Sequence, residues 1–223
     1  MTELADRIRA ELRAAADADR APKMQAYMKS EMPFLGVPAP LARSITGAAR
    51  RAHPPAGLDE LLVTVEDLWD GAEFREERYA AQHLMRDRLT RGVLELLPLH
   101  EKIAVTGAWW DHVDEVARHI ADLHDEYPAE TADAVRRWSL GENLWLRRLA
   151  IISQLSRKDR LDTGVLTEVI EPALSEPEFF LRKAIGWALR EHAKTDPDWV
   201  RAYVCDHEDV LSGLSRREAL KNL

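Results

Sequence analysis

The sequence is poor in the residues that crosslink chains or interrupt helices. It contains one cysteine, Cys205, and ten glycines in 223 residues. A single thiol cannot form an internal disulfide, which excludes the disulfide-rich secreted scaffolds and fits a reducing compartment. No stretch approaches the roughly 20 apolar residues that span a bilayer, and the first four residues lack the basic end and apolar run of a signal peptide. We therefore expect a soluble, cytoplasmic protein.

Basic residues are also in deficit. The chain has 31 Lys and Arg against 39 Asp and Glu, a formal charge of −8 at pH 7. Because polyphosphates are bound by basic surfaces, this total argues against a nucleic-acid partner. The charges are unevenly spread, however. Residues 32–58 and 143–158 contain no acid, and their cations are Arg43, Arg50, Arg51, Arg147, Arg148, Arg157 and Lys158. An acidic protein can still carry a basic face.

Patterns that favour helices fill most of the chain. Apolar residues recur at helical spacing, as at Leu4, Ile8 and Leu12, which are four residues apart. Pro and Gly divide the chain into segments of about 10 to 20 residues, the length of ordinary helices. Ser139, Ser175 and Asp196 are expected to mark helix starts. We predict an all-α fold in a single domain over residues 1–223, large enough to bury a core without crosslinks.

A repeat of about 35 residues runs through this helical sequence. Segments 74–80, 144–150, 180–184 and 214–219 each place a cation in the first turns of an expected helix, and these cations are Arg78, Arg148, Lys183 and Arg217. The intervals are 148 − 78 = 70, 183 − 148 = 35 and 217 − 183 = 34, so a further unit is expected near position 113. In that unit Trp110 is followed by Asp114, a carboxylate where the other units have a cation.

This period is typical of stacked helix pairs, in which each repeat buries its apolar face against its neighbours. The tetratricopeptide pattern of Trp, Gly, Tyr and Pro is absent, so the sequence favours a HEAT-like helical-repeat solenoid. Equivalent positions of successive repeats would then form one basic stripe on the concave side. The alternative is that these cations are solvated charges on unrelated helix faces.

Trp110 and Asp114 are the strongest candidates for chemistry. They lie four residues apart and so share one face of a helix. An indole can hold a cation against its π face, and a carboxylate beside it can stabilise developing positive charge or orient a water molecule. The structural alternative is that Asp114 pairs with a neighbour such as Arg148. Trp109, on another face, is interpreted as a core residue.

Trp187 has a similar setting. Lys183 precedes it by four residues and Arg190 follows it by three, so one helix face carries a cation, an indole and a second cation. Alternatively, Trp187 packs in the core and the two cations are solvated. The remaining tryptophans have no comparable polar neighbours on their faces and are interpreted as packing residues: Trp69, Trp138, Trp145 and Trp199.

Signatures of several other chemistries are missing. The chain has no Gly-rich phosphate loop, no Gly-x-Ser-x-Gly elbow and no His-Glu-x-x-His motif. One segment is rich in possible ligands, but their spacing matches no standard metal site: Asp111, His112, His119, Asp122 and His124. We expect neither a metal nor a cofactor, and we interpret Cys205 as a residue of a surface turn.

These motifs together resemble the AlkD-type DNA alkylation-repair glycosylases, a family of HEAT-like repeats, over nearly the whole chain. The landmarks are the segments 27–29, 34–37, 68–70, 109–114, 143–148 and 178–191. The last three, which read Trp-Trp-Asp-x-Val-Asp, Asn-x-Trp-Leu-x-Arg and Glu-Phe-Phe through Leu-Arg-Glu, are specific in combination. The chain departs from the family at Pro38 and Ala39, where members often carry polar residues that contact DNA.

The resemblance implies catalytic roles for Trp110, Asp114 and Trp187 at the damaged nucleotide, with Arg148 in the same site and on the DNA backbone. Together with the predicted stripe, the other expected DNA contacts are Tyr27, Lys29, Arg43, Arg78, Lys183, Arg190 and Arg217.

The implied activity is hydrolysis of the N-glycosidic bond of cationic N3- or N7-alkylated purines, bulky adducts included, in double-stranded DNA. The resemblance also implies that the base is not flipped into a pocket. The expected enzyme is a monomer. It should lack lyase activity, because no lysine is placed beside Asp114 to form a Schiff base. The rival interpretation is a non-catalytic helical-repeat scaffold that binds DNA or another protein.

Overall fold

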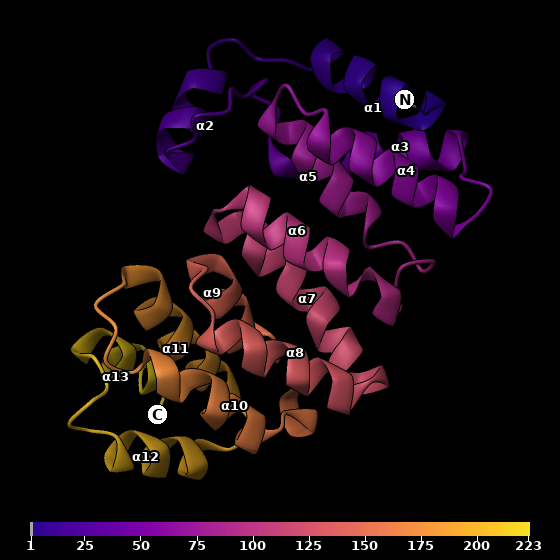
Figure 1. Cartoon of the computed structure of the whole chain (residues 1–223). Coiled ribbons are helices and arrows are strands. Elements are labelled where there is room, and N and C mark those ends of the chain that lie inside the picture. Colours follow the sequence, from indigo (N-terminus) through magenta and orange to yellow (C-terminus); the bar gives the residue numbers. More distant parts are fainter. Residues whose placement is uncertain (1) are drawn as a thin grey trace. The chain divides into compact units, whose positions relative to one another are not determined.

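Helices account for the architecture of residues 2–223, the part of the chain that the computed structural model describes (Figure 1). The α-helices are α1 (Glu3–Ala14), α2 (Ala21–Met28), α3 (Ala39–Ala52), α4 (Leu58–Asp70), α5 (Arg75–Leu84), α6 (Leu97–Gly107), α7 (Trp110–Glu126), α8 (Pro128–Leu140), α9 (Leu144–Ile152), α10 (Thr163–Ile170), α11 (Phe179–His192), α12 (Pro197–Asp206) and α13 (Gly213–Ala219). Short 3-10 helices are η1 (Leu94–Leu96), η2 (Lys158–Arg160) and η3 (Glu171–Ala173). Residues 2–223 contain no strand, so the predicted all-α class is confirmed.

The chain divides into two compact units. The N-terminal unit ends at Arg91 and holds α1 to α5, and the C-terminal unit, Gly92–Leu223, holds α6 to α13. The single domain over residues 1–223 stays a prediction. None of the described helices is both long enough and apolar enough to cross a membrane.

The starts of the helices confirm the 35-residue repeat. Helices α5, α7, α9, α11 and α13 begin at residues 75, 110, 144, 179 and 213, so the intervals are 110 − 75 = 35, 144 − 110 = 34, 179 − 144 = 35 and 213 − 179 = 34. In the C-terminal unit α9 packs on α7 and on α11, and α11 packs on α13 (Figure 1). In this unit α7, α9, α11 and α13 therefore form a row in which each helix packs against the next. The unit expected near residue 113 is α7.

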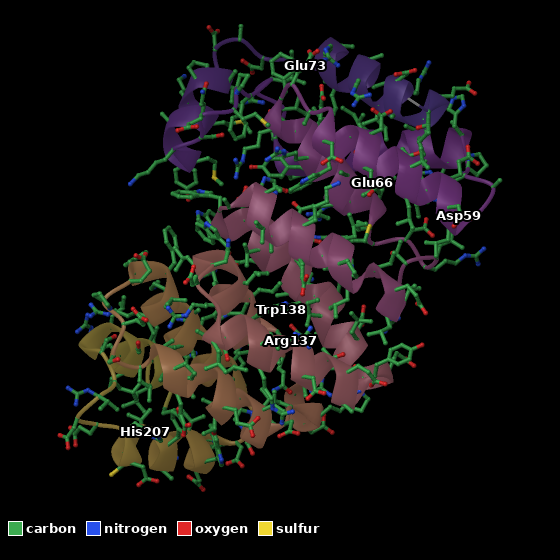
Figure 2. The ribbon with its side chains drawn as sticks, in the orientation of Figure 1. Asp59, Glu66, Glu73, Arg137, Trp138 and His207 are labelled. Carbon is green, nitrogen blue, oxygen red and sulfur yellow. The ribbon has the colours of Figure 1, made fainter. Side chains whose placement is uncertain are left out.

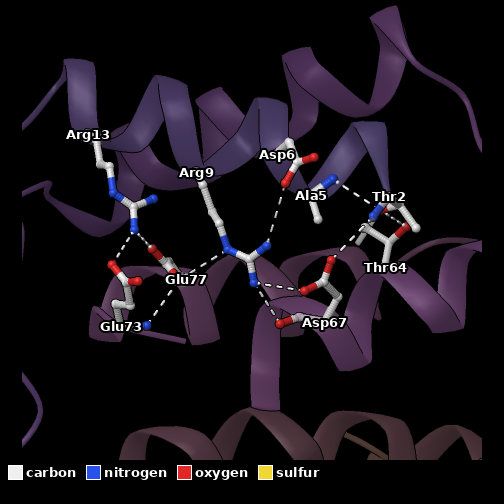
Figure 3. A network of polar contacts seen from close by, with 9 residues as sticks. All are labelled: Thr2, Ala5, Asp6, Arg9, Arg13, Thr64, Asp67, Glu73 and Glu77. Carbon is white, nitrogen blue, oxygen red and sulfur yellow. Dashed lines mark hydrogen bonds and ion pairs between the residues drawn. The ribbon is translucent and has the colours of Figure 1, made fainter. Parts of the chain in front are cut away.

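A partly buried polar network joins α1 to α4 and α5 (Figure 3). Arg9 donates from Nη2 to Oδ1 of Asp67 at 3.0 Å and to the backbone oxygen of the same residue at 2.7 Å. Its Nε lies 3.4 Å from Oε2 of Glu77, a fully buried carboxylate, and Nη2 of Arg13 lies 3.0 Å from Oε1 of Glu77. Two guanidinium groups thus compensate one buried charge, which would be costly without them.

A second buried carboxylate fixes the segment that enters α3. Glu76 accepts the backbone N–H groups of Leu35, Gly36 and Val37 at 3.0, 2.9 and 3.1 Å. Gly36 has φ +85°, and a Cβ there would lie 2.2 Å from the backbone oxygen of Asp17. Only glycine fits this close approach, so the Phe-Leu-Gly segment has a structural reason for its sequence.

One of the three expected helix starts is correct. Asp196 caps α12 by accepting the N–H of Trp199 at 2.9 Å. Ser139 lies inside α8 and donates to a backbone oxygen of its own helix, and α9 is capped by Asn143. Ser175 lies before the true cap of α11, Glu178. The spacing predictions were wrong at both serines because a cap must directly precede the first helical residue to reach its free N–H groups.

Four tryptophans were expected to pack without polar neighbours: Trp69, Trp138, Trp145 and Trp199. The first three are buried and Trp199 is half-buried. The ring of Trp69, however, lies 4.9 Å from the guanidinium carbon of Arg78. Trp138, seen on α8 in Figure 2, donates from Nε1 to Oε1 of Glu101 at 2.5 Å. Packing is therefore confirmed for the three buried rings, and the expected lack of polar neighbours is wrong for Trp69 and Trp138.

Candidate functional site

A tight turn between α6 and α7 places the Trp-Trp-Asp segment. Ala108 has φ +43°, and Trp109 is extended and precedes the first residue of α7, Trp110. A Cβ on Gly107 would lie 2.9 Å from Cβ of His112, so glycine allows the two helices to approach at this point. Asp114 is the fifth residue of α7 and shares a helix face with Trp110, as the spacing predicts.

Asp114 forms a two-pronged ion pair with Arg148, the fifth residue of α9. Nε of Arg148 donates to Oδ1 at 2.9 Å and Nη2 donates to Oδ2 at 3.0 Å. The two residues occupy equivalent positions in adjacent repeats, which explains why they meet. The salt bridge that the sequence left as a structural alternative is therefore present, and its geometry is the strong fork arrangement of an arginine on a carboxylate.

Arg148 also ties the pair to a third helix. Its Nη1 donates to the backbone oxygen of Phe180 in α11 at 2.8 Å. The side chain of Arg148 is buried, with 6% of its area exposed, whereas Asp114 keeps 19% exposed. Arg148 therefore anchors α7, α9 and α11 together, and only the carboxylate reaches solvent. A contact between Arg148 and the DNA backbone stays a prediction.

Two opposing effects set the pKa of Asp114, namely burial and the ion pair with Arg148. Burial raises the pKa of Asp114 to about 6, and the charge and hydrogen bonds of Arg148 oppose that rise. The nearby charge of Asp111 raises the pKa further. At neutral pH the group is thus an ionised carboxylate in a largely dry setting, where electrostatic interactions are stronger than in water.

The neighbouring aromatic rings divide into a packed set and a half-exposed one. Trp109 lies 5.8 Å from Trp145 and 5.3 Å from Phe180, measured between ring centroids, and Phe180 lies 5.0 Å from Trp145. Trp109 is half-buried, so it packs at the edge of this cluster. Trp110 is also half-exposed, and within residues 2–223 it joins none of these ring contacts.

Trp187 lies on α11 between two cations, as predicted, but neither cation is simply solvated. Nζ of Lys183 lies 3.2 Å from Oε1 of Glu218 in α13, and Arg190 forms an ion pair with Oε2 of the same carboxylate. Trp187 is half-exposed. This group of four residues sits one repeat beyond the Asp114 and Arg148 pair, to which α11 is joined through Phe180.

The row of cations in the C-terminal unit is graded rather than uniformly exposed. Arg148, Lys183 and Arg217 are each the fifth residue of their helices. Arg148 is buried, Lys183 is half-buried and paired, and Arg217 is exposed. The predicted equivalence of position is confirmed, while the interpretation of the row as solvated charges is wrong for Arg148.

The other predicted DNA contacts lie in the N-terminal unit. Tyr27 is 78% exposed, Lys29 directly follows the last residue of α2 with φ +50°, and Arg43 is exposed on α3. Arg78 is half-buried over Trp69, and its pKa is lowered by burial and by the charge of Arg75.

Acidic side chains of the same unit lie on other elements. Asp59 and Glu66 of α4 and Glu73 in the segment that follows are all exposed (Figure 2). By contrast, every charged residue of α3 is an arginine. The net charge of −8 therefore averages over surfaces of opposite character.

Two contributions to this site were missed from the sequence. One is the backbone oxygen of Phe180, which no side-chain pattern could reveal. The other is Glu218, a carboxylate that directly follows the predicted stripe residue Arg217. Inspection of the residues next to each repeat position could have found it.

The histidines of α7 and Cys205 have other placements. His119 stacks on His100 of α6 at 5.1 Å, and Nε2 of His124 lies 3.2 Å from the hydroxyl of Ser153. Within the described residues no group of three His, Cys, Asp or Glu side chains is arranged to hold a metal ion. Cys205 is exposed in the last turn of α12 rather than in a surface turn.

A cavity of about 270 Å³ lies elsewhere in the C-terminal unit, lined by the ends of α9 and α11 and the loop between α9 and α10. Its lining includes Ile151, Leu155, Leu166 and His192, and none of the predicted site residues. The Asp114 carboxylate therefore does not belong to this cavity.

Comparisons with known proteins show the family to which the chain belongs. Residues 8–223 match the family described as DNA alkylation repair enzyme. A solved structure from Enterococcus faecalis, described as a predicted DNA alkylation repair enzyme, is similar with a TM-score of 0.84 and 31% identity, over 93% of this chain and 96% of that chain. No protein of curated function matches. The chain belongs to the DNA alkylation repair enzyme family and has its all-helical repeat fold and its role in DNA repair.

Proposed function

We propose that the protein is a DNA glycosylase that hydrolyses the N-glycosidic bond of cationic N3- or N7-alkylated purines in duplex DNA. The observation that carries the proposal is the carboxylate of Asp114, which is partly exposed, ionised at neutral pH and held in a fixed orientation by the buried Arg148. A surface acid without such support would rotate freely, whereas catalysis requires a group locked by its neighbours.

The chemistry needs little more than this charge. Alkylation at N3 or N7 makes the purine cationic and therefore a good leaving group. When the C1′–N bond breaks, its electron pair neutralises the base and a positive charge develops on the deoxyribose. Water then forms the C1′–O bond and releases a proton. Asp114 stabilises the sugar cation and aligns the water, an electrostatic effect of several kcal/mol in a dry site.

Two half-exposed indoles complete the proposed site. Trp110 shares the helix face of Asp114, and Trp187 lies on α11, the helix to which Arg148 is bonded. Both can pack against the deoxyribose and the cationic nucleotide. Loss of either indole would cost about 1–2 kcal/mol, or about tenfold in rate.

The proposed enzyme is monofunctional and does not flip the base into a pocket. The cation that contacts Asp114 in the described part of the chain is Arg148, and a guanidinium stays protonated and forms no Schiff base. A base that is not flipped need not fit a pocket. Bulky cationic adducts would then be tolerated, and neutral lesions such as uracil would be poor substrates because their bases leave less readily.

The test is chromatography of the bases freed from methylated duplex DNA. Wild-type protein is expected to release 7-methylguanine or 3-methyladenine. Asp114→Asn should slow release by about 100-fold or more, while DNA affinity stays equal or rises because a negative charge is removed. Asp111→Asn, which makes the same charge change three residues earlier in α7, is the matched control and should retain activity. If the wild-type protein binds DNA and releases no base, the enzyme proposal fails and a scaffold role stands.

A further inference from the structure

Glu218 is held unusually close to α11, and a glycine makes this possible. A Cβ on Gly186 would lie 2.5 Å from Cβ of Glu218 and 3.1 Å from the backbone oxygen of Ser215. The hydroxyl of Ser215 donates to the backbone oxygen of Arg182 at 3.0 Å. Helix α13 is therefore locked onto α11 at the level of the residue that precedes Trp187.

The carboxylate of Glu218 bridges the two cations on either side of Trp187. One oxygen lies 3.2 Å from Nζ of Lys183 and the other pairs with Nη1 of Arg190. Since these cations are seven residues apart on one helix face, the carboxylate spans two turns of α11. Burial raises the pKa of Glu218, but the hydrogen bond and charge of Lys183 and the charge of Arg190 outweigh it and lower the pKa.

This arrangement is that of an anion with one charge and two terminal oxygens held between a lysine and an arginine. A phosphodiester has the same charge and also presents two terminal oxygens, and the same donors recognise it. All three side chains remain partly exposed, with 40% of Lys183, 25% of Arg190 and 19% of Glu218 accessible, so a second anion can reach the cations from solvent.

We propose that Glu218 is a built-in competitor for a DNA phosphate. In the free protein it occupies Lys183 and Arg190, and when DNA binds a phosphate displaces it from both cations. To bind, the phosphate must break both ion pairs of Glu218, and the loss of those two ion pairs weakens binding to any duplex. This inference rests on the proposed function only in requiring that α11 contacts DNA; it adds a residue that limits affinity for undamaged DNA.

The experiment measures the Kd for an undamaged 20-bp duplex at fixed salt. Glu218→Gln keeps the shape and Cβ of the side chain, so the packing on Gly186 is retained. We expect it to tighten binding about three- to tenfold. The gain should vanish in a Lys183→Ala/Arg190→Ala background, because the competitor then has nothing to release. Unchanged or weaker binding by Glu218→Gln, or the same gain in the double-alanine background, overturns the proposal.

Two controls separate competition from other effects. Glu191→Gln removes an acid of α11 that pairs with Lys194 at 2.6 Å, and it should change affinity much less than Glu218→Gln. Thermal melting of each variant checks that its stability matches that of the wild-type protein. Base release by the wild-type protein tests the proposed function separately, so normal base release with no effect of Glu218→Gln defeats this inference alone.

Discussion

At the scale of residues, the site rests on one charge pair with unequal exposure. Arg148 is buried and donates hydrogen bonds to Asp114 and to the backbone oxygen of Phe180, while the carboxylate of Asp114 is partly exposed to solvent. Removing both charges from water is costly, and the fork geometry recovers part of that cost. The pKa of Asp114 reflects both effects: burial raises it to about 6, and Arg148 opposes the rise.

Base release is therefore expected to depend on pH with a midpoint near 6. Above pH 6 Asp114 is ionised and can stabilise a sugar cation, and below it the group becomes protonated and neutral. kcat/KM should then fall about tenfold per pH unit on the acid side. The measurement is release of 7-methylguanine between pH 5 and 8, with spontaneous depurination subtracted.

Arg148→Ala provides the control for this assignment. Without the opposing guanidinium, burial and the Asp111 charge act alone and the midpoint should move above 6. A flat profile between pH 5 and 8 in the wild-type protein would show that ionisation of Asp114 is not required.

At the scale of elements, the sequence predicted the positions of the repeat but only part of how the repeats are joined. The 35-residue period correctly placed Asp114 and Arg148 at equivalent sites, because buried apolar faces repeat with the helices. It left open whether Asp114 pairs with Arg148, since the charge of a side chain does not determine which partner it meets; the structure shows that the two are paired. The role of the Phe180 backbone oxygen has no side-chain signature at all.

At Gly186 the contact between α11 and α13 makes glycine necessary, although helix propensities alone would favour alanine. In an exposed helix, Gly→Ala stabilises by up to about 1 kcal/mol. Here a Cβ would lie 2.5 Å from Cβ of Glu218, so Gly186→Ala should push α13 away and lower the free energy of unfolding by about 1–3 kcal/mol. Urea denaturation measures this change.

Gly47 of α3 is the matched control for that substitution. A Cβ there would be 3.4 Å from Nη1 of Arg51, the mobile end of a long side chain. Gly47→Ala should therefore stabilise the protein by a few tenths to about 1 kcal/mol. If both alanines have the same effect, close packing at Gly186 does not control the docking of α13.

At the scale of the whole molecule, buried neutral histidines should make the fold sensitive to acid. Burial and the charge of His119 lower the pKa of His100 to about 3, and burial and Arg157 lower that of His124 to about 4. The unfolded chain takes up protons at these sites near pH 6.5, whereas the folded protein does not, so stability falls as pH drops below 6.5. Asp114 acts in the opposite direction because its pKa is raised in the folded state.

The expected loss is about 1.4 kcal/mol per pH unit for each of these histidines between pH 6 and 4. Urea unfolding at pH 7, 6 and 5 measures it. His124→Gln, which can keep a hydrogen bond to Ser153, should remove about 1.4 kcal/mol per pH unit of this loss. Equal stability at pH 7 and pH 5 would contradict the assignment.

The charge of the whole molecule leads to a last prediction, on salt. A protein of net charge −8 can bind DNA only through local cations, each of which releases counterions from the phosphate it meets. Arg217, exposed at the fifth position of α13, is the open end of the graded row. Arg217→Ala should reduce the slope of log K against log salt by about 0.9. Arg118→Ala, whose side chain on α7 is 72% exposed and lies outside that row, should leave the slope unchanged. A flat slope for the wild-type protein would instead indicate a protein partner.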